Sequence, residues 1–169
     1  MFKALDIANM YINLANGLGD HIDNLKLNKM LYYAQGWHLA RFGEPLFDDT
    51  IEAWEYGPVI PAVYHAYKMC GDNAIAEPIN VFDEHALTND QLSLLTDVYI
   101  TYGKFTGNEL VRRTHRPGSP WSSVFVRGAN NEVDKEALRV YFENNNELQE
   151  FEVPGTIPVI DYTSRRSDS

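Results

Sequence analysis

The sequence predicts a mainly α-helical protein, a compact single-domain bundle of about six to seven helices with a short extended segment after the second one. Apolar residues recur at helical spacing in several separate segments, and residues that commonly cap helices stand at the borders of those segments. The length of 169 residues suits one domain with enough chain to bury a sizeable core.

The first expected helix begins near Ala4 and carries its apolar residues along one face. These residues are Leu5, Ile7, Ala8, Tyr11, Ile12 and Ala15. The glycine-containing run at 16–19 ends this helix. We expect it to pack against the rest of the domain and to carry no chemistry.

A second helix is expected over residues 27–42, and it is apolar on several sides, so most of it must be buried. Its polar residues, Gln35 and His38 among them, then need a narrow solvent strip or a hydrogen-bond partner. For His38 we favour a satisfied structural histidine over a catalytic base or a metal ligand. Gly43 at the C-cap and Pro45 shortly after it end the helix.

A short extended stretch and a shaped turn follow at residues 51–58. Gly57 is flexible, and Pro58 disfavours the α region for the residue before it, so regular helix is not expected there. Pro61 suits the first turn of a helix that continues to about Met69. Residues 71–87 are then expected to form a loop with short ordered pieces.

Three later helices are indicated by residues that cap helix N-termini. These residues are Thr88, Thr106 and Asp134. Gln91 stands at the capping-box position of the first, which should end near Tyr102. The last should end at the asparagine run 144–146, and residues 122–126 add a turn before it.

The charge balance is acidic, with 14 Lys and Arg against 24 Asp and Glu and a net charge of −10. Direct nucleic-acid binding is disfavoured, because such a protein repels phosphate backbones. The same field would attract basic proteins, although acidity for solubility alone has equal weight. One basic cluster comprises Arg112, Arg113, Arg116 and Arg127; it could bind an anion, but a solvated helix end is favoured.

Neither a membrane-spanning segment nor a secretory signal is recognisable, so we expect a cytoplasmic protein without membrane insertion. The single cysteine, Cys70, excludes an intrachain disulfide and a multi-cysteine zinc site. No nucleophile elbow, zinc-binding HExxH or phosphate-cradling glycine loop is present. We therefore expect no enzyme, no metal and no cofactor.

A composite motif occupies residues 26–64 and consists of a helix, a turn and a proline-led second helix. Its first half reads KLNKMLYYAQGWHLARFGEPLF and its second half reads IEAWEYGPVIPAVY. This motif resembles the hallmark of the Panacea-domain antitoxins, which include SocA-like antitoxins and GepA-type proteins of prophages and other mobile elements. A weaker signature, THxxxxPW, matches at Thr114, His115, Pro120 and Trp121. The resemblance covers about residues 1–145 and leaves 146–169 as a C-terminal tail.

The resemblance implies an antitoxin that neutralises a cognate protein toxin, encoded beside it, by direct stoichiometric binding. Aromatic side chains on a rigid turn lose little entropy when they dock, so we expect the toxin to bind the turn and nearby residues. The candidate toxin-binding residues are Trp54, Glu55, Tyr56, Gly57, Pro58, Val59 and Tyr33. The alternative is that these aromatic residues belong to the core. The motif residues read as structural are Lys29, Gln35, His38, Pro61, Tyr64, Thr114, His115 and Trp121.

Two other functions remain open. A proteolytic adaptor would deliver the toxin to a housekeeping protease, so a protease or chaperone is a possible partner. An enzyme that removes a modification from the toxin or its target is less favoured, because no catalytic site is recognisable. The tail at 146–169 contains apolar residues that favour an extended conformation and are suited to binding a partner. Packing of the tail across its own domain is equally favoured.

Overall fold

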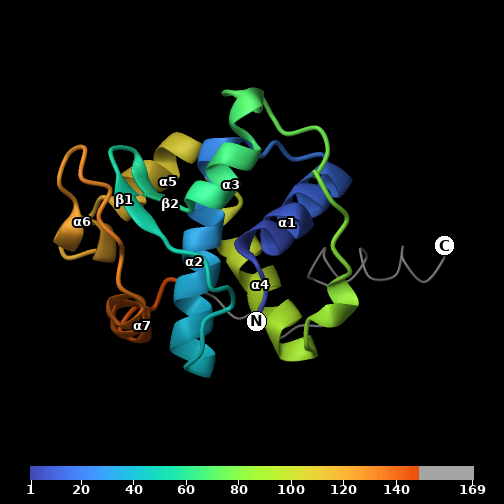
Figure 1. Cartoon of the computed structure of the whole chain (residues 1–169). Coiled ribbons are helices and arrows are strands. Elements are labelled where there is room, and N and C mark those ends of the chain that lie inside the picture. Colours follow the sequence, from blue (N-terminus) through green and yellow to red (C-terminus); the bar gives the residue numbers. More distant parts are fainter. Residues whose placement is uncertain (149–169) are drawn as a thin grey trace.

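The computed structural model describes residues 1–148, and it confirms the predicted mainly α fold (Figure 1). Most of the predicted tail, residues 149–169, lies outside the described residues. Within residues 1–148 there are seven α-helices, two 3₁₀ helices and one two-stranded antiparallel sheet. The elements are α1 Ala4–Leu18, α2 Asn24–Phe42, β1 Glu52–Trp54, β2 Gly57–Val59, α3 Pro61–Ala66, η1 Lys68–Cys70, η2 Glu84–Ala86, α4 Asn89–Tyr102, α5 Gly107–Thr114, α6 Pro120–Val124 and α7 Lys135–Glu143.

Helix α2 is the central element, and α1, α3, α4, α5, α7 and β2 all pack against it (Figure 1). Fifteen of its nineteen residues are buried, as expected for a helix that is apolar on several sides. The carboxylate of Asp23 accepts a hydrogen bond from the Lys26 amide at 2.8 Å and caps its N-terminus. Gly43, with φ +74°, ends the helix at the predicted residue.

The closest packing in the bundle joins α2 to α7. A Cβ atom placed on Gly36 would lie 2.2 Å from ring atoms of Phe142, so only glycine admits this contact. The rings of Tyr32, Tyr33 and Trp37 surround Phe142 with centroid distances of 5.6, 6.0 and 5.2 Å. Helix α7 thus docks through one aromatic side chain into an aromatic socket on α2.

All three predicted helix caps are present. Thr88 and Gln91 form the capping box of α4, while the side chains of Thr106 and Asp134 accept backbone hydrogen bonds of 3.1 and 3.0 Å at the starts of α5 and α7. The loop predicted at 71–87 is also found, with η2 as its ordered piece. Local side-chain chemistry is sufficient to fix these boundaries.

Two helix boundaries differ from the prediction. Helix α2 begins at Asn24, three residues before the predicted start, because Asp23 caps it, whereas α1 ends within the predicted run, with Gly19 (φ +74°) as its C-cap. Helix α3 stops at Ala66, three residues before the predicted end. Tyr67 leaves the helical conformation there, its side chain is buried, and its hydroxyl donates a hydrogen bond to Asn9 on α1.

The hairpin formed by β1 and β2 lies at one edge of the bundle, with α5 and α6 beside it (Figure 1). Pairing of β1 with β2 places Trp54 opposite Gly57, so Glu55 and Tyr56 form a two-residue turn. The outer edge of β1 is covered by residues 131–133, through hydrogen bonds from Ala53 to Asn131 and from Val133 to Ile51, both 2.8 Å long. The expected extended segment is therefore half of a hairpin.

Candidate functional site

The hairpin passes so close to α2 that Gly57 is required at the start of β2. Its φ is +106°, a conformation that side-chain-bearing residues rarely adopt. A Cβ atom here would lie 2.6 Å from Cε of Lys29 and 2.9 Å from Oγ1 of Thr114. The glycine of the motif thus allows the strand to rest directly on two other motif residues.

Three side chains from α2 and α6 hold the hairpin backbone. Nζ of Lys29 donates a hydrogen bond of 3.1 Å to the carbonyl oxygen of Pro58. Oδ1 of Asn28 accepts one of 2.9 Å from the amide of Ile60. Nε1 of Trp121 donates one of 2.7 Å to the carbonyl oxygen of Trp54. The hairpin is therefore fixed at both of its strands before any partner binds.

Lys29 is unusual because a lysine amine is rarely buried completely. Burial lowers its pKa to about 7, and the nearby Asp23 carboxylate opposes this shift. Pro58 supplies its hydrogen-bond acceptor, and the alkyl chain of Lys29 supports Gly57 from below. Lys29 thus holds α2 and the hairpin together by a hydrogen bond and by packing.

The THxxxxPW segment supports the hairpin from the side of α6. The ring of His115 stacks on Trp121 with centroids 3.8 Å apart, and Phe125 stacks on Trp121 at 4.4 Å. Burial, followed by the charge of Lys29, lowers the pKa of His115. Its Nε2 atom is buried and has no hydrogen-bond partner within residues 1–148. Ser119, itself buried, starts α6 by accepting a hydrogen bond of 3.1 Å from the Ser122 amide.

Gln35 and His38 organise the chain that leads from α2 to the hairpin. The Gln35 side chain donates to the carbonyl oxygen of Phe47 at 2.8 Å and accepts from the amides of Leu46 and Phe47 at 2.8 and 3.3 Å. Nδ1 of His38 lies 2.6 Å from the carbonyl oxygen of Glu44, while Nε2 lies 3.2 Å from Nε2 of Gln91. These bonds fit an Nδ1-protonated neutral ring, and burial lowers the pKa of His38 in agreement.

Pro61 and Tyr64 connect the hairpin to α3. Pro61 is the first residue of that helix, where its missing amide costs nothing. The carbonyl oxygen of Tyr64 accepts a hydrogen bond of 3.0 Å from the Asn24 side chain on α2. The Tyr64 ring packs edge-on against Trp54 with centroids 5.0 Å apart, so the hairpin has support on this side too.

The structure divides the seven candidate toxin-binding residues into an exposed and a buried group. Tyr56 has 66% of its surface exposed, Glu55 is exposed, and Trp54 is half-buried. Gly57, Pro58 and Val59 are buried in the supporting strand. Tyr33 is only 4% exposed and stacks on Tyr102 with centroids 3.7 Å apart, so it presents no surface to a partner in this conformation.

Arg127 adjoins the exposed group, whereas the sequence grouped it with Arg112, Arg113 and Arg116, which lie at α5 instead. Arg127 forms an ion pair with Glu55 at 3.2 Å, and its neighbour Val126 is 58% exposed. They arrive beside the turn because residues 131–133 pair with β1, a contact between segments distant in sequence that leaves no local signal. We call Trp54, Glu55, Tyr56, Val126 and Arg127 the hairpin surface.

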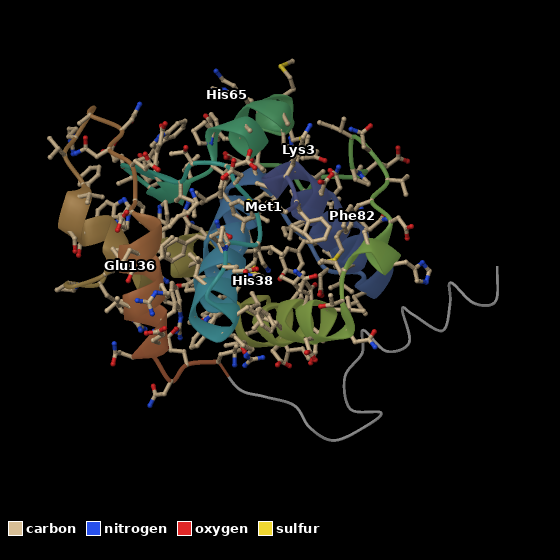
Figure 2. The ribbon with its side chains drawn as sticks, turned by 60° about the horizontal axis from the view of Figure 1, so that its bottom comes forward. Met1, Lys3, His38, His65, Phe82 and Glu136 are labelled. Carbon is tan, nitrogen blue, oxygen red and sulfur yellow. The ribbon has the colours of Figure 1, made fainter. Side chains whose placement is uncertain are left out.

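The structure does not bring His38, His65 and His115 together as an acid–base site would require. Figure 2 shows His38 inside the bundle and His65 pointing outward at its periphery, while His115 lies at the end of α5. Among the residues described, no three His, Cys, Asp or Glu side chains are grouped as metal ligands would be. No helix within 1–148 has the length and hydropathy required to cross a membrane.

Comparison with known proteins agrees with the motif. The family described as "Antitoxin SocA-like, Panacea domain" matches residues 27–122, the segment that contains the hairpin and the Asn28, Lys29 and Trp121 side chains that bind its backbone. Antitoxin SocA of Caulobacter vibrioides (strain NA1000 / CB15N) is 32% identical over 127 residues, which cover 70% of this chain and 68% of that relative. No solved structure matches the chain. The resemblance predicted from the sequence is confirmed, and the chain belongs to the SocA-like Panacea-domain antitoxin family.

Proposed function

We propose that this protein neutralises a cognate protein toxin, encoded beside it, by direct stoichiometric binding through the hairpin surface. Family membership supports the antitoxin role. The observation that carries the choice of surface is an exposed aromatic residue, Tyr56, on a turn whose backbone is held by hydrogen bonds from Lys29 and Trp121.

The chemistry of the hairpin surface supports this choice. Tyrosine, tryptophan and arginine are the residues most often found to dominate binding energy at protein interfaces, and all three occur here. Because the turn is held before binding, docking would cost little conformational entropy. A neutralising interface is expected to bury about 1,600 Å² in total, so the hairpin surface would be its centre and not its whole extent.

Neutralisation by variants tests the proposal. Tyr56→Ala and Trp54→Ala should each weaken binding to the purified toxin by about thirtyfold, the effect of losing a hot-spot side chain. Met69→Ala is the matched control, because Met69 is 98% exposed and lies on η1 outside the hairpin surface. Affinity is measured by calorimetry, and rescue of growth by co-expression. Variants that fold and neutralise as well as the parent would refute the assignment of this surface.

The two other mechanisms predict different readouts in the same system. An inhibitor that binds directly should abolish toxin activity only near one equivalent, whereas a modifying enzyme should act at a small fraction of that amount. A proteolytic adaptor should shorten the half-life of the toxin in cells, whereas a direct inhibitor should leave it unchanged or lengthen it. A stable toxin silenced at one equivalent is the result expected.

A further inference from the structure

Helix α5 presents a basic face on the side turned away from the core. Its buried residues, Gly107, Leu110 and Thr114, pack towards α2 and β2. Arg112 and Arg116 are exposed, and Arg113 is half-buried. We use the name α5 basic face for Lys104, Phe105, Arg112, Arg113 and Arg116. Since Thr114 faces the hairpin, this face is distinct from the hairpin surface.

Positive charge is concentrated on this face although the whole protein carries a net charge of −10. Within the described part of the chain, Lys104, Arg112 and Arg113 form no ion pair. Glu109 lines a hollow together with Arg112 and Arg113, and Asp23 and Asp72 line another together with Lys104. Arg116 does have a partner, because its Nη1 atom lies 2.6 Å from Oε1 of Glu147. The α5 basic face therefore already binds one carboxylate, that of Glu147, and its other three basic side chains are not in an ion pair within residues 1–148.

The face is shaped as well as charged. The guanidinium of Arg113 lies 3.8 Å above the ring of Phe105, and Nζ of Lys104 lies 5.4 Å from the same ring. A hollow of about 310 Å³ is lined by Phe105, Glu109, Arg112, Arg113 and Arg116. Stacking on an aromatic ring orders an arginine side chain, so less entropy is lost when its guanidinium binds an anion.

The spacing of the arginines suits an extended peptide. Arg112 and Arg116 are four residues apart on a helix, which corresponds to about 6 Å along its axis. Alternate residues of an extended chain lie about 6.7 Å apart and point to the same side. Carboxylates at alternate positions could therefore meet Arg112 and, in place of Glu147, Arg116, while an apolar residue nearby contacts Phe105. A long nucleic acid fits less well, because the overall negative charge repels a polyanion.

We propose that the α5 basic face docks an acidic, extended segment of a partner protein, with carboxylates at alternate positions and an adjacent apolar residue. This surface is separate from the hairpin surface and does not depend on the function proposed for it. Binding is expected to be weak and sensitive to salt, as for exposed ion pairs. It would add a second contact to any complex that the protein forms.

A fluorescent acetylated peptide, Glu-Leu-Glu-Phe-Glu, titrated against the full chain by anisotropy tests this proposal. The peptide should bind, its all-glutamine counterpart should bind at least tenfold more weakly, and Arg112→Ala should weaken binding about fivefold. Lys68→Ala, which removes an exposed charge from η1, is the matched control and should bind as the parent does. Tyr56→Ala should also leave the affinity unchanged, which separates this surface from the hairpin surface.

Three results would overturn the proposal. Equal affinity of Arg112→Ala and the parent would place the peptide elsewhere. A labelled oligothymidine that binds as tightly as the peptide, and is lost in the same variant, would assign the face to phosphates. The chain itself has glutamates at positions 150 and 152. If the variant Glu150→Gln/Glu152→Gln binds the peptide tenfold more tightly, the natural occupant is the chain's own carboxylates and not a partner.

Discussion

The indole nitrogen of Trp121 donates a hydrogen bond of 2.7 Å to the backbone carbonyl oxygen of Trp54, across 67 positions of sequence. The bond joins the first turn of α6 to the last residue of β1, directly before the exposed turn. One of the two sequence motifs thus supports the other, because the THxxxxPW segment supplies the donor that fixes the hairpin. Conformation of the hairpin surface should depend on a residue that is itself buried.

Replacing Trp121 by phenylalanine tests this dependence. The variant keeps an aromatic ring for stacking but leaves the carbonyl oxygen of Trp54 without its indole donor, which should cost about 1–3 kcal/mol of stability. Trp54→Phe is the control, since its indole donates to Glu52 in a half-buried position and its loss should cost less. Urea denaturation followed by circular dichroism measures both. Equal costs would mean that the bond to Trp54 does not set the stability of the hairpin.

Gly57 should be harder to replace than Gly128, another glycine with a positive φ. In Gly57→Ala the new methyl group must displace Lys29 and Thr114, which adds about 1–3 kcal/mol of overpacking to about 1–2 kcal/mol of backbone strain. Gly128→Ala separates the two costs, because Gly128 also has a positive φ, +79°, but no atom within 4 Å of the new methyl group. Thermal unfolding should therefore show a clearly larger loss for Gly57→Ala. Similar losses would show that backbone strain alone acts at Gly57.

Lys29 should make stability rise with pH above neutrality. Its pKa is about 7 in the folded chain and near 10.5 in a solvated lysine, so between these values the unfolded chain binds more protons. Unfolding then becomes less favourable as the pH rises, by up to about 1.4 kcal/mol per pH unit. The penalty for the buried charge is fully present below about pH 7. Lys29→Met should remove this slope, whereas Lys68→Met, at an exposed position, should retain it.

Other titrating groups allow this window to be isolated. Burial lowers the pKa of His38 and His115 from 6.5, so their contributions fall below that pH. Burial raises the pKa of Tyr11 and Tyr32 above 10.0. Their contributions to the pH dependence of stability therefore begin in more alkaline solution, and they lower stability as the pH rises. Burial also lowers the pKa of Lys26, which adds to the slope at the alkaline end. Urea titrations between about pH 7 and 9 therefore report chiefly on Lys29; an unchanged slope in Lys29→Met would contradict the assignment.

Several helix starts and ends of this fold could be predicted from the sequence, because they depend on residues that are close together in the chain. Thr88, Thr106 and Asp134 cap helices because their side chains reach amides three residues away, and Gly43 ends α2 because it adopts a positive φ. Such contacts are encoded within a few residues of sequence. They were therefore accessible without knowing how the helices pack.

The arrangement of the site was less accessible, because it depends on contacts between distant segments. A helix that is apolar on several sides does not reveal which aromatic residues face a neighbour, so Tyr33 could not be separated from the turn residues in sequence. The stacking of Tyr33 on Tyr102 resolves that question. Likewise, Arg127 reaches Glu55 only because residues 131–133 pair with β1, and neither segment carries a pattern that specifies this pairing.

The contact between Gly36 and Phe142 predicts a size-dependent coupling between α2 and α7. Alanine ordinarily stabilises a helix relative to glycine by about 1 kcal/mol, but in Gly36→Ala its methyl group would overlap the Phe142 ring. We expect a net loss of about 1–3 kcal/mol instead. Phe142→Ala should cost about 3–5 kcal/mol, because it empties the aromatic socket on α2.

The double variant Gly36→Ala/Phe142→Ala measures the coupling directly. With the ring gone, the methyl group at position 36 no longer overlaps anything in the socket and should regain part of its ordinary helix-stabilising effect. The double variant should therefore be more stable than the sum of the single losses predicts, by about 0.5–3 kcal/mol. Urea denaturation of the parent and the three variants gives this coupling energy. Additive losses would show that α7 shifts away from α2 and that Gly36 is not what admits the ring.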